Sequence, residues 1–247
     1  MANNYFRFKQ CTIQQEHCAM KVCTDACIFG AFIAGHINNR QPAVIHILDI
    51  GTGTGLLSLM LAQQLPFNGK IDAVELDEAA FQQAKQNFEQ SQWTDRLRIF
   101  NQNALLFHPA KKYDFIICNP PFFEGDLISG NNKKNAAKHA TMLTLIQLLS
   151  VIGENLGVNG SFAVLLPSHR AAYFIKIAME AKYFFTEQLL LAHTSNHPFF
   201  RAILCFSRLK STFTGNELII KNIKGNYTPE FTGLLKEYYL HLEENNA

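Results

Sequence analysis

The sequence predicts an α/β fold in which a mostly parallel sheet carries helices on both faces. Strand-like apolar runs alternate with helix-like segments through five units, the typical pattern of parallel strands joined by crossover helices. The 247 residues, 48% of them hydrophobic, suffice for one domain with a sizeable core. Two further strand-like segments are separated only by HTSNHPFF, too short for a crossover helix. We therefore expect seven strands with an antiparallel hairpin at the sheet edge.

The overall charge and the apolar runs limit the possible partners. The formal net charge is +2, so local patches rather than overall charge would have to attract a polyanion. The first ten residues lack the apolar stretch of a signal peptide, and no run is long enough to span a membrane. We expect a cytoplasmic protein that binds no membrane and has no stable protein partner.

Cys18, Cys23 and Cys27 lie close together in the sequence, which raises the possibility of a metal site. Metal ligands typically come in closely spaced pairs followed by a second pair or by histidines, and here no second pair follows. Reduced, buried thiols are the better interpretation, and we expect no metal.

The first 40 residues precede the alternating pattern. Phe6–Lys9 favours a short strand, and Met20–Cys23 favours a second strand or an extended loop. Thr24 or Asp25 could cap a helix that runs toward Gly35.

A glycine-rich turn follows the first buried strand, at 44–50, and precedes a helix. Such a turn lets the backbone approach a ligand closely, and the N–H groups of the helix can meet an anionic group. Leu56 and Ser58 stand where a dinucleotide-binding turn has its third glycine, and no Lys-Ser/Thr pair follows as in a phosphate-binding loop. The glycines are Gly51, Gly53 and Gly55.

The second and third strands end in polar residues. Glu75 lies at the expected end of the second strand, where a carboxylate can accept both hydroxyls of a ribose. Asp77 is better placed to cap the helix 78–90. The third strand, Leu97–Phe100, is followed by Asn103.

The fourth strand, at 113–118, ends in Asn119-Pro120-Pro121-Phe122. The strand must stop there because proline has no N–H to donate to the sheet. The Asn119 side chain and the Pro120 carbonyl offer two acceptors, and Phe122 offers a flat ring. The residues fit a site that holds a planar NH2 group, and they fit a plain proline-rich turn equally well.

The segment after Phe122 is basic, with Lys133, Lys134 and Lys138 and no acid between them. It could be a solvated loop or a phosphate-contacting one. The later elements are expected as a helix at 136–149, a strand at 161–167, a helix at 169–181, hairpin strands at 184–192 and 202–206, a strand at 218–221 and a helix at 231–242.

One spatial rule brings these motifs together. In open parallel sheets, ligands bind outside the carboxyl ends of the strands. The glycine turn, Glu75, Asn103 and Asn119 all follow strands and should therefore meet at that edge.

LDIGTGTG, AVELD and ICNPPF together resemble the Rossmann-like, class I S-adenosylmethionine-dependent methyltransferases that methylate a nitrogen conjugated to a ring or carbonyl. FRFKQ…HCAMKVCTDACIFGAF, and HPFFRAILCF through NYTPEF, resemble the tRNA-valine adenine N6-methyltransferase family, so the likeness covers nearly the whole chain. The chain departs from the family pattern at Cys23, where the family has glycine, and at Asn103, where an acid is common.

The resemblance implies S-adenosylmethionine as cofactor, without a metal, and adenine 37 of tRNA-Val as target. Alternatives are an adenine of ribosomal RNA or DNA, a protein glutamine amide, or an RNA-binding module without activity. It also implies a single domain over 1–247, with 1–40 as an extension closing over cofactor and substrate and 41–247 as the catalytic core.

The implied site falls into three groups. The catalytic group is Asn119, Pro120, Pro121 and Phe122. The cofactor group is Lys21, Thr24, Asp25, Asp49, Gly51, Gly53, Gly55, Glu75, Asn103 and Asn119, although helix capping explains Thr24 and Asp25 equally well. The substrate group is Phe122, Lys133, Lys134, Lys138, Arg170 and Arg201, the five basic residues as phosphate contacts.

Overall fold

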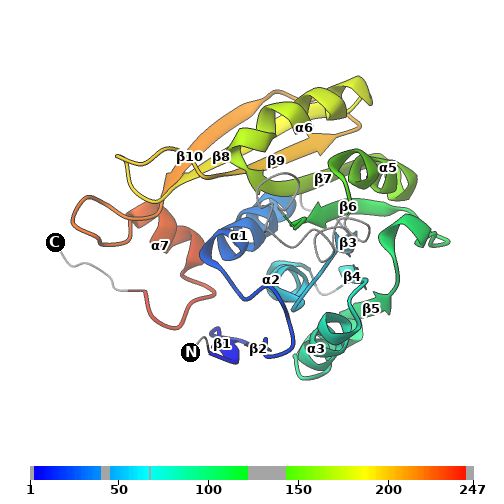
Figure 1. The fold of residues 1–247 in the computed structure, drawn as a ribbon, viewed down its shortest axis with the longest axis horizontal. Coiled ribbons are helices and arrows are strands. Elements are labelled where there is room, and N and C mark those ends of the chain that lie inside the picture. Colours follow the sequence, from blue (N-terminus) through cyan, green and yellow to red (C-terminus); the bar gives the residue numbers. More distant parts are fainter. Residues whose placement is uncertain (1–2, 40–44, 67, 122–142, 243–247) are drawn as a thin grey trace, which may run out of the picture.

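The computed structural model describes residues 3–39, 45–66, 68–121 and 143–242. Its main feature is a twisted eight-stranded sheet, in the order β10-β8-β9-β7-β6-β3-β4-β5 (Figure 1). The strands are β3 (His46–Ile50), β4 (Lys70–Glu75), β5 (Leu97–Asn101), β6 (Tyr113–Cys118), β7 (Leu156–Pro167), β8 (Phe184–Ala192), β9 (Arg201–Ser207) and β10 (Thr214–Ile219). The helices are α1 (Thr24–Asn38), α2 (Leu56–Gln64), α3 (Glu78–Glu89), α5 (Leu145–Asn155), α6 (Ser168–Glu180) and α7 (Pro229–Leu235). Short 3-10 turns are η1 (Thr94–Arg96) and η2 (Ala104–Leu106).

The strands β7, β6, β3, β4 and β5 form the predicted parallel block. Ile47 and Ile117 belong to a core cluster on one face, which α1, α2 and α7 cover. Leu48 and Ile116 belong to a second cluster on the other face, which α5 and α6 cover. Burial on both faces explains why β3 and β6, at the centre of the block, are largely apolar runs in the sequence.

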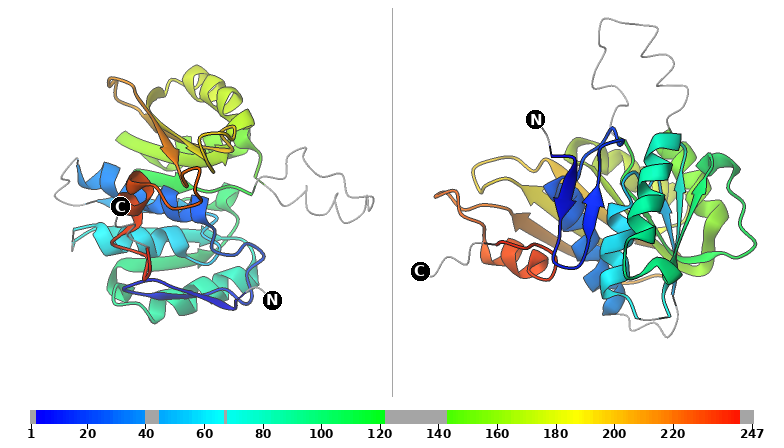
Figure 2. Two further views of the ribbon diagram at one scale, coloured as in Figure 1. Left: turned by 90° about the vertical axis from the view of Figure 1, so that its left-hand side faces the viewer. Right: turned by 90° about the horizontal axis from the view of Figure 1, so that it is seen from below.

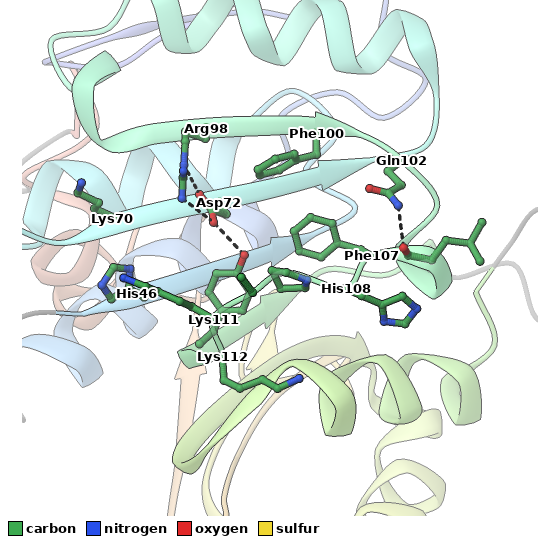
Figure 3. A pocket seen from close by; sticks show the side chains of 14 residues that line it. His46, Lys70, Asp72, Arg98, Phe100, Gln102, Phe107, His108, Lys111 and Lys112 are labelled. Atoms are coloured by element: carbon green, nitrogen blue, oxygen red, sulfur yellow. Dashed lines mark hydrogen bonds and ion pairs between the residues drawn. The ribbon is translucent and has the colours of Figure 1, made fainter.

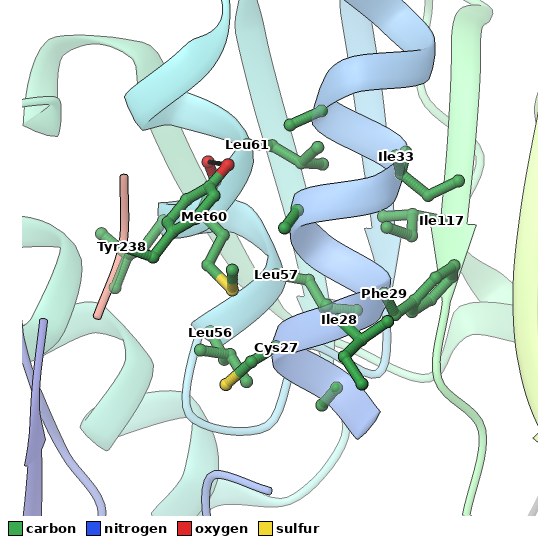
Figure 4. Close-up of a cluster of buried hydrophobic side chains, with 14 of the residues drawn as sticks. Cys27, Ile28, Phe29, Ile33, Leu56, Leu57, Met60, Leu61, Ile117 and Tyr238 are labelled. Atoms are coloured by element: carbon green, nitrogen blue, oxygen red, sulfur yellow. Dashed lines mark hydrogen bonds between the residues drawn. The ribbon is translucent and has the colours of Figure 1, made fainter. Parts of the chain in front are cut away.

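The packing of α1 on α2 is unusually close (Figure 4). A Cβ atom at Gly30 would lie 2.8 Å from the sulfur of Met60. Glycine inside this helix therefore has a packing reason, since any side chain would separate the two helices.

The hairpin β8–β9 is antiparallel, as predicted, but it is not the outermost pair of the sheet. The strand β10 pairs with β8 in parallel and occupies the edge, so the sheet has eight strands instead of the predicted seven. The apolar pattern places this last strand at 218–221, whereas it starts at Thr214. Its first four residues are exposed, so they lack the apolar pattern that would mark them in the sequence.

The N-terminal residues form a separate hairpin, β1 (Tyr5–Arg7) with β2 (Thr12–Gln14), which lies against α3 (Figure 2). The segment at 20–23 is extended and belongs to no strand. Cys23 is the N-cap of α1 and makes no side-chain capping bond, so the predicted cap by Thr24 or Asp25 is wrong. The Asp25 carboxylate pairs instead with Arg201.

Other helix ends follow their sequence signals. The Asp77 carboxylate accepts a hydrogen bond from the Ala80 N–H at 2.9 Å and caps α3, as predicted. A capping box of Thr144 and Gln147 starts α5. The predicted start of this helix, at 136, lies outside the described residues. The last helix, α7, spans 229–235 and is shorter than predicted.

The cysteines near the N-terminus are buried or half-buried. Burial raises the pKa of Cys18 to about 11 and the pKa of Cys23 and Cys27 to about 12, so these thiols are protonated at neutral pH. Among the described residues, none of the helices is both long and apolar enough to cross a membrane.

Candidate active site

A cavity of about 430 Å³ opens at the carboxyl ends of the parallel strands. Its volume is within the usual range for small-molecule sites. It is lined by Ile50, Gly51, Val74, Glu75, Leu76, Asp77, Glu78, Gln102, Asn103, Ala104, Cys118, Pro120, Pro121 and Leu143. The predicted residues Gly51, Glu75, Asn103, Pro120 and Pro121 therefore meet in one place, as the strand-end rule requires.

The glycines of the turn serve two different purposes. All three have positive φ, at 70° for Gly51, 58° for Gly53 and 82° for Gly55. A Cβ atom at Gly51 or Gly53 would meet nothing within 4 Å, so these two leave open space above the turn. At Gly55 a Cβ atom would lie 2.5 Å from the ring of Phe88 on α3. Gly51, which lines the cavity, and Gly53 therefore leave space beside the turn, and their contact with a ligand stays a prediction, while Gly55 has a packing reason.

Glu75 fixes the turn to the end of β4. One carboxylate oxygen accepts from the Gly53 N–H at 2.9 Å, and the other accepts from the Asp77 N–H at 2.9 Å. The side chain is half-buried and lines the cavity. Glu75 thus ends the strand and faces the cavity, which is the position that the sequence predicts for a ribose contact.

Asp49 lies beneath the same turn and does not line the cavity. It is fully buried and accepts from the Thr52 hydroxyl at 2.6 Å and the Ser58 hydroxyl at 2.7 Å. Its Oδ1 has no hydrogen-bond partner in the described part of the chain. Burial raises the pKa of this carboxyl to about 6. Asp49 holds the turn from below, and a contact with the cofactor stays a prediction.

Asn103 caps η2, where its Oδ1 accepts from the Leu105 N–H at 3.0 Å. The same side chain lines the cavity beside Gln102. Its position next to the ends of β4 and β5 matches the prediction, although its contact with an adenine ring is untested.

The corner after β6 contains a buried, unsatisfied acceptor. The Oδ1 atom of Asn119 is buried and makes no hydrogen bond within the described residues. Buried polar atoms without partners are rare and cost about 1–3 kcal/mol each. Asn119 is not itself part of the cavity lining, but its chain neighbours Cys118 and Pro120 are, so a ligand in the cavity could supply the missing partner. Phe122, Lys133, Lys134 and Lys138 lie outside the described residues.

A smaller cavity adjoins the first one, with Pro120 and Pro121 lining both. Pro167 and Arg170, at the end of β7 and the start of α6, complete the far wall of this second cavity. Arg170, a basic residue of the predicted substrate group, therefore lies beside the NPP corner.

Four further predicted residues, Lys21, Thr24, Asp25 and Arg201, are not in the lining of the active-site cavity. Lys21 donates to the Gln15 carbonyl, and Thr24 interacts with Tyr239. The Nε of Arg201 donates to the Asp25 carboxylate at 2.8 Å, and both side chains are largely buried. The ion pair joins α1 to β9, so Arg201 is less available for phosphate contact than the sequence suggests.

Sequence reasoning missed several residues of the site. Leu76 and Gln102 follow the ends of β4 and β5 directly, so the strand-end rule could have found them. Asn87, on α3, gave no local signal, yet its amide donates to the Thr54 carbonyl in the glycine turn at 2.8 Å.

The lining of the active-site cavity is acidic. Glu75, Asp77 and Glu78 line it, and its lining contains no lysine, arginine or histidine among the described residues. Carboxylates favour a positively charged ligand, and a sulfonium cofactor with an amino group carries such charge.

The fold and the site together define a Rossmann-like, class I methyltransferase, the class that uses S-adenosylmethionine. The defining features are the strand, glycine turn and helix, the acid at the end of the next strand, and the NPP corner after a third strand. Solved structures share the fold. A predicted O-methyltransferase from Agrobacterium tumefaciens superposes with a TM-score of 0.66 at 14% identity, over 86% of this chain and 96% of that one. A putative class I S-adenosylmethionine-dependent methyltransferase from Listeria monocytogenes superposes with a TM-score of 0.61 at 13% identity, over 87% of this chain and 72% of that one.

The chain belongs to the tRNA1(Val) (adenine(37)-N6)-methyltransferase family. A relative of that name from Dyadobacter fermentans is 42% identical, over 96% of this chain and 98% of its own length. A relative of the same name from Pectobacterium carotovorum is 36% identical, over 96% of this chain and 94% of its own length. One from Bacteroides thetaiotaomicron is also 36% identical, over 98% of this chain and 100% of its own length. The family described as "Methyltransferase small domain" matches residues 30–156.

Proposed function

We propose that the protein transfers a methyl group from S-adenosylmethionine to N6 of adenine 37, beside the anticodon of tRNA-Val. The observation that carries this proposal is the buried Oδ1 of Asn119, which has no partner among the described residues and stands between Cys118 and Pro120, two residues that line the cavity. The relatives' names support the choice of RNA and nucleotide. No metal is part of this reaction.

The active-site cavity fits the cofactor, which supplies an electrophilic methyl group on a positively charged sulfur. Glu75 would accept the ribose hydroxyls, and Asn103 would contact the edge of the adenine. The open backbone at Gly51 and Gly53 would admit the methionine part. The acidic lining stabilises the positive charge of the bound cofactor.

The NPP corner would prepare the target nitrogen. The exocyclic amine of adenine is a weak nucleophile because its lone pair is delocalised into the ring. Asn119 Oδ1 and the Pro120 carbonyl accept its two N–H groups and direct the lone pair toward the methyl group. Alignment supplies most of the rate gain, so the site needs no strong general base. Phe122 is assigned to stack on the base, as expected from the sequence.

The N-terminal extension, 1–40, would close over cofactor and substrate, with 41–247 as the catalytic core of the same domain. Besides burial, the charges of Glu75, Lys21 and Asp77 affect the pKa of the Cys18 thiol, which supports a position of this segment near Glu75 and Asp77. Thr24 and Asp25 start the helix that follows. A cytoplasmic location, where tRNA is modified, is part of the same proposal.

The direct test is a methyl-transfer assay on a defined RNA. The protein is incubated with methyl-tritiated S-adenosylmethionine and a tRNA-Val transcript, and the nucleosides are identified by mass spectrometry. We expect N6-methyladenosine in this transcript and no label when guanine replaces adenine 37. Label at another nucleotide, or transfer only to ribosomal RNA, DNA or protein glutamine, would refute the proposed substrate.

A further inference from the structure

A third cavity, distinct from the two at the active site, lies where the fold has an irregular crossover. The strands β5 and β6 are joined by the single turn η2 and by irregular residues at 107–112, whereas the other strands of the parallel block are joined through helices. One face of β4 and β5 is therefore left without a covering helix. A cavity of about 640 Å³ lies on this face, larger than the candidate active site (Figure 3).

The lining of this basic cavity carries an excess of positive charge. Lys70, Arg98, Lys111 and Lys112 line it, together with His46 and His108. The acid in its lining is Asp72, which already accepts from Arg98 at 2.8 Å and from the Tyr113 hydroxyl at 2.8 Å (Figure 3).

The basic side chains of this cavity differ in whether other groups of the protein already bind them. Lys112 donates to the Glu154 carbonyl, and His108 lies 3.8 Å from the Glu154 carboxylate. Lys70 and Lys111 are exposed, and no bond to either side chain is found within the described residues. These two lysines are the charges that a ligand could use most directly.

The basic cavity and the candidate active site lie at opposite ends of the same strand. Lys70 begins β4, Glu75 ends it, and Gln102 lines both cavities. At about 3.3 Å per residue, the two ends are about 16 Å apart. A folded RNA that places one nucleotide in the active site extends well beyond this distance, so its backbone can reach both.

We propose that the basic cavity binds backbone phosphates of the RNA substrate, away from the target nucleotide. The inference rests on the proposed function and adds a second contact region to it. The active-site cavity is lined by acids and repels phosphate, and the net charge of the chain is only +2, so a local patch must supply the attraction. Exposed lysines hold one small anion weakly, whereas a polyanion gains from every contact through counterion release.

The test compares charge removal inside and outside the cavity. Lys70→Gln/Lys111→Gln removes the two exposed charges. Lys210→Gln/Lys224→Gln removes two exposed charges that follow β9 and β10, near the sheet edge opposite β5, as a matched control. Binding of tRNA-Val is measured over a range of salt concentrations. Affinity for S-adenosylmethionine and the melting temperature are measured alongside.

We expect the Lys70/Lys111 variant to bind tRNA-Val about tenfold more weakly, with a salt-dependence slope lower by about 0.9 per lost contact. The affinity for S-adenosylmethionine and kcat at saturating tRNA should match the wild type, as should every property of the control. A wild-type tRNA affinity and salt slope in the Lys70/Lys111 variant would overturn the inference. If the wild-type protein bound tRNA but transferred no methyl group, the proposed function would fail while this binding test still reported on the cavity.

Discussion

Two buried oxygens without partners lie at the ends of the neighbouring strands β3 and β6. Oδ1 of Asp49 and Oδ1 of Asn119 both lack hydrogen bonds within the described residues. Ile50 lies opposite Cys118 in the sheet, so the two residues are close to the same strand ends. Unsatisfied buried groups are costly, and each one in a native structure calls for an explanation. Asn155 and Arg208 carry such atoms elsewhere in the fold, whereas these two lie at the strand ends where the reaction is proposed to occur.

Asp49 predicts a specific pH dependence of stability. Its pKa of about 6 in the folded protein exceeds the ordinary value of 3.8, because burial disfavours the charged form. The folded state thus binds the proton more tightly than the unfolded chain. The stabilisation that the protonated Asp49 gives the folded state is complete below pH 4 and is lost as the pH rises to 6. Between the two pKa values the free energy of unfolding falls by about 1.4 kcal/mol for each pH unit.

Asp49→Asn removes this titration. Between pH 4 and pH 7, the free energy of unfolding of the wild type should fall by about 3 kcal/mol relative to the variant. Urea denaturation of both proteins at several pH values measures the difference. A difference that stays constant over this range would show that Asp49 titrates normally.

At the scale of elements, one side chain joins the N-terminal hairpin, α3 and the glycine turn. The Asn87 amide donates to the carbonyls of Gln14 and Thr54, each at 2.8 Å, and its Oδ1 accepts from the Gln14 N–H at 2.9 Å. Asn87 is itself fully buried. The hairpin is thereby coupled to the turn that would hold the cofactor.

We predict that Asn87→Ala costs about 2–4 kcal/mol of stability, because it leaves three backbone groups without their partners. It should also weaken S-adenosylmethionine binding, since the turn loses a support at Thr54. Urea denaturation and calorimetry measure the two effects. Gln82→Ala, an exposed change on the same helix, is the control and should cost about 0.5 kcal/mol or less. An Asn87→Ala protein with wild-type cofactor affinity would refute the coupling.

The same scale shows what sequence patterns could predict. The parallel block, the cap at Asp77 and the strand end at Glu75 follow from local periodicity and local capping, and all three are confirmed. The start of β10 was missed because its first four residues are exposed and lack an apolar pattern, and its pairing with β8 has no local signal. The ion pair of Asp25 with Arg201 joins residues 176 positions apart, and no local pattern indicates such a contact.

At the scale of the whole molecule, the ends of four neighbouring strands form one site from motifs spread along half of the chain. The strand-end rule predicts that Gly51, Glu75 and Asn103 meet, because each of them follows a parallel strand, and all three line one cavity. The basic cavity has no comparable signal in the sequence, because it arises from a missing crossover helix and not from a run of basic residues.

The central claim is that this sheet edge has two parts with separate tasks. Asn103, with Glu75 and the glycine turn, belongs to the part that would hold the cofactor. Asn119 belongs to the part that would hold the amine. Substitutions in the two parts should therefore affect different measured quantities.

The most direct measurement combines calorimetry with S-adenosylmethionine and tritium-methyl transfer to tRNA-Val. Asn119→Ala should bind the cofactor with near wild-type affinity and lose methyl transfer by about a hundredfold or more, since preorganised polar groups of this kind contribute that much to rate. The control, Asn103→Ala, should bind the cofactor more weakly and keep most of kcat at saturating cofactor. Full methyl transfer by Asn119→Ala would contradict the account.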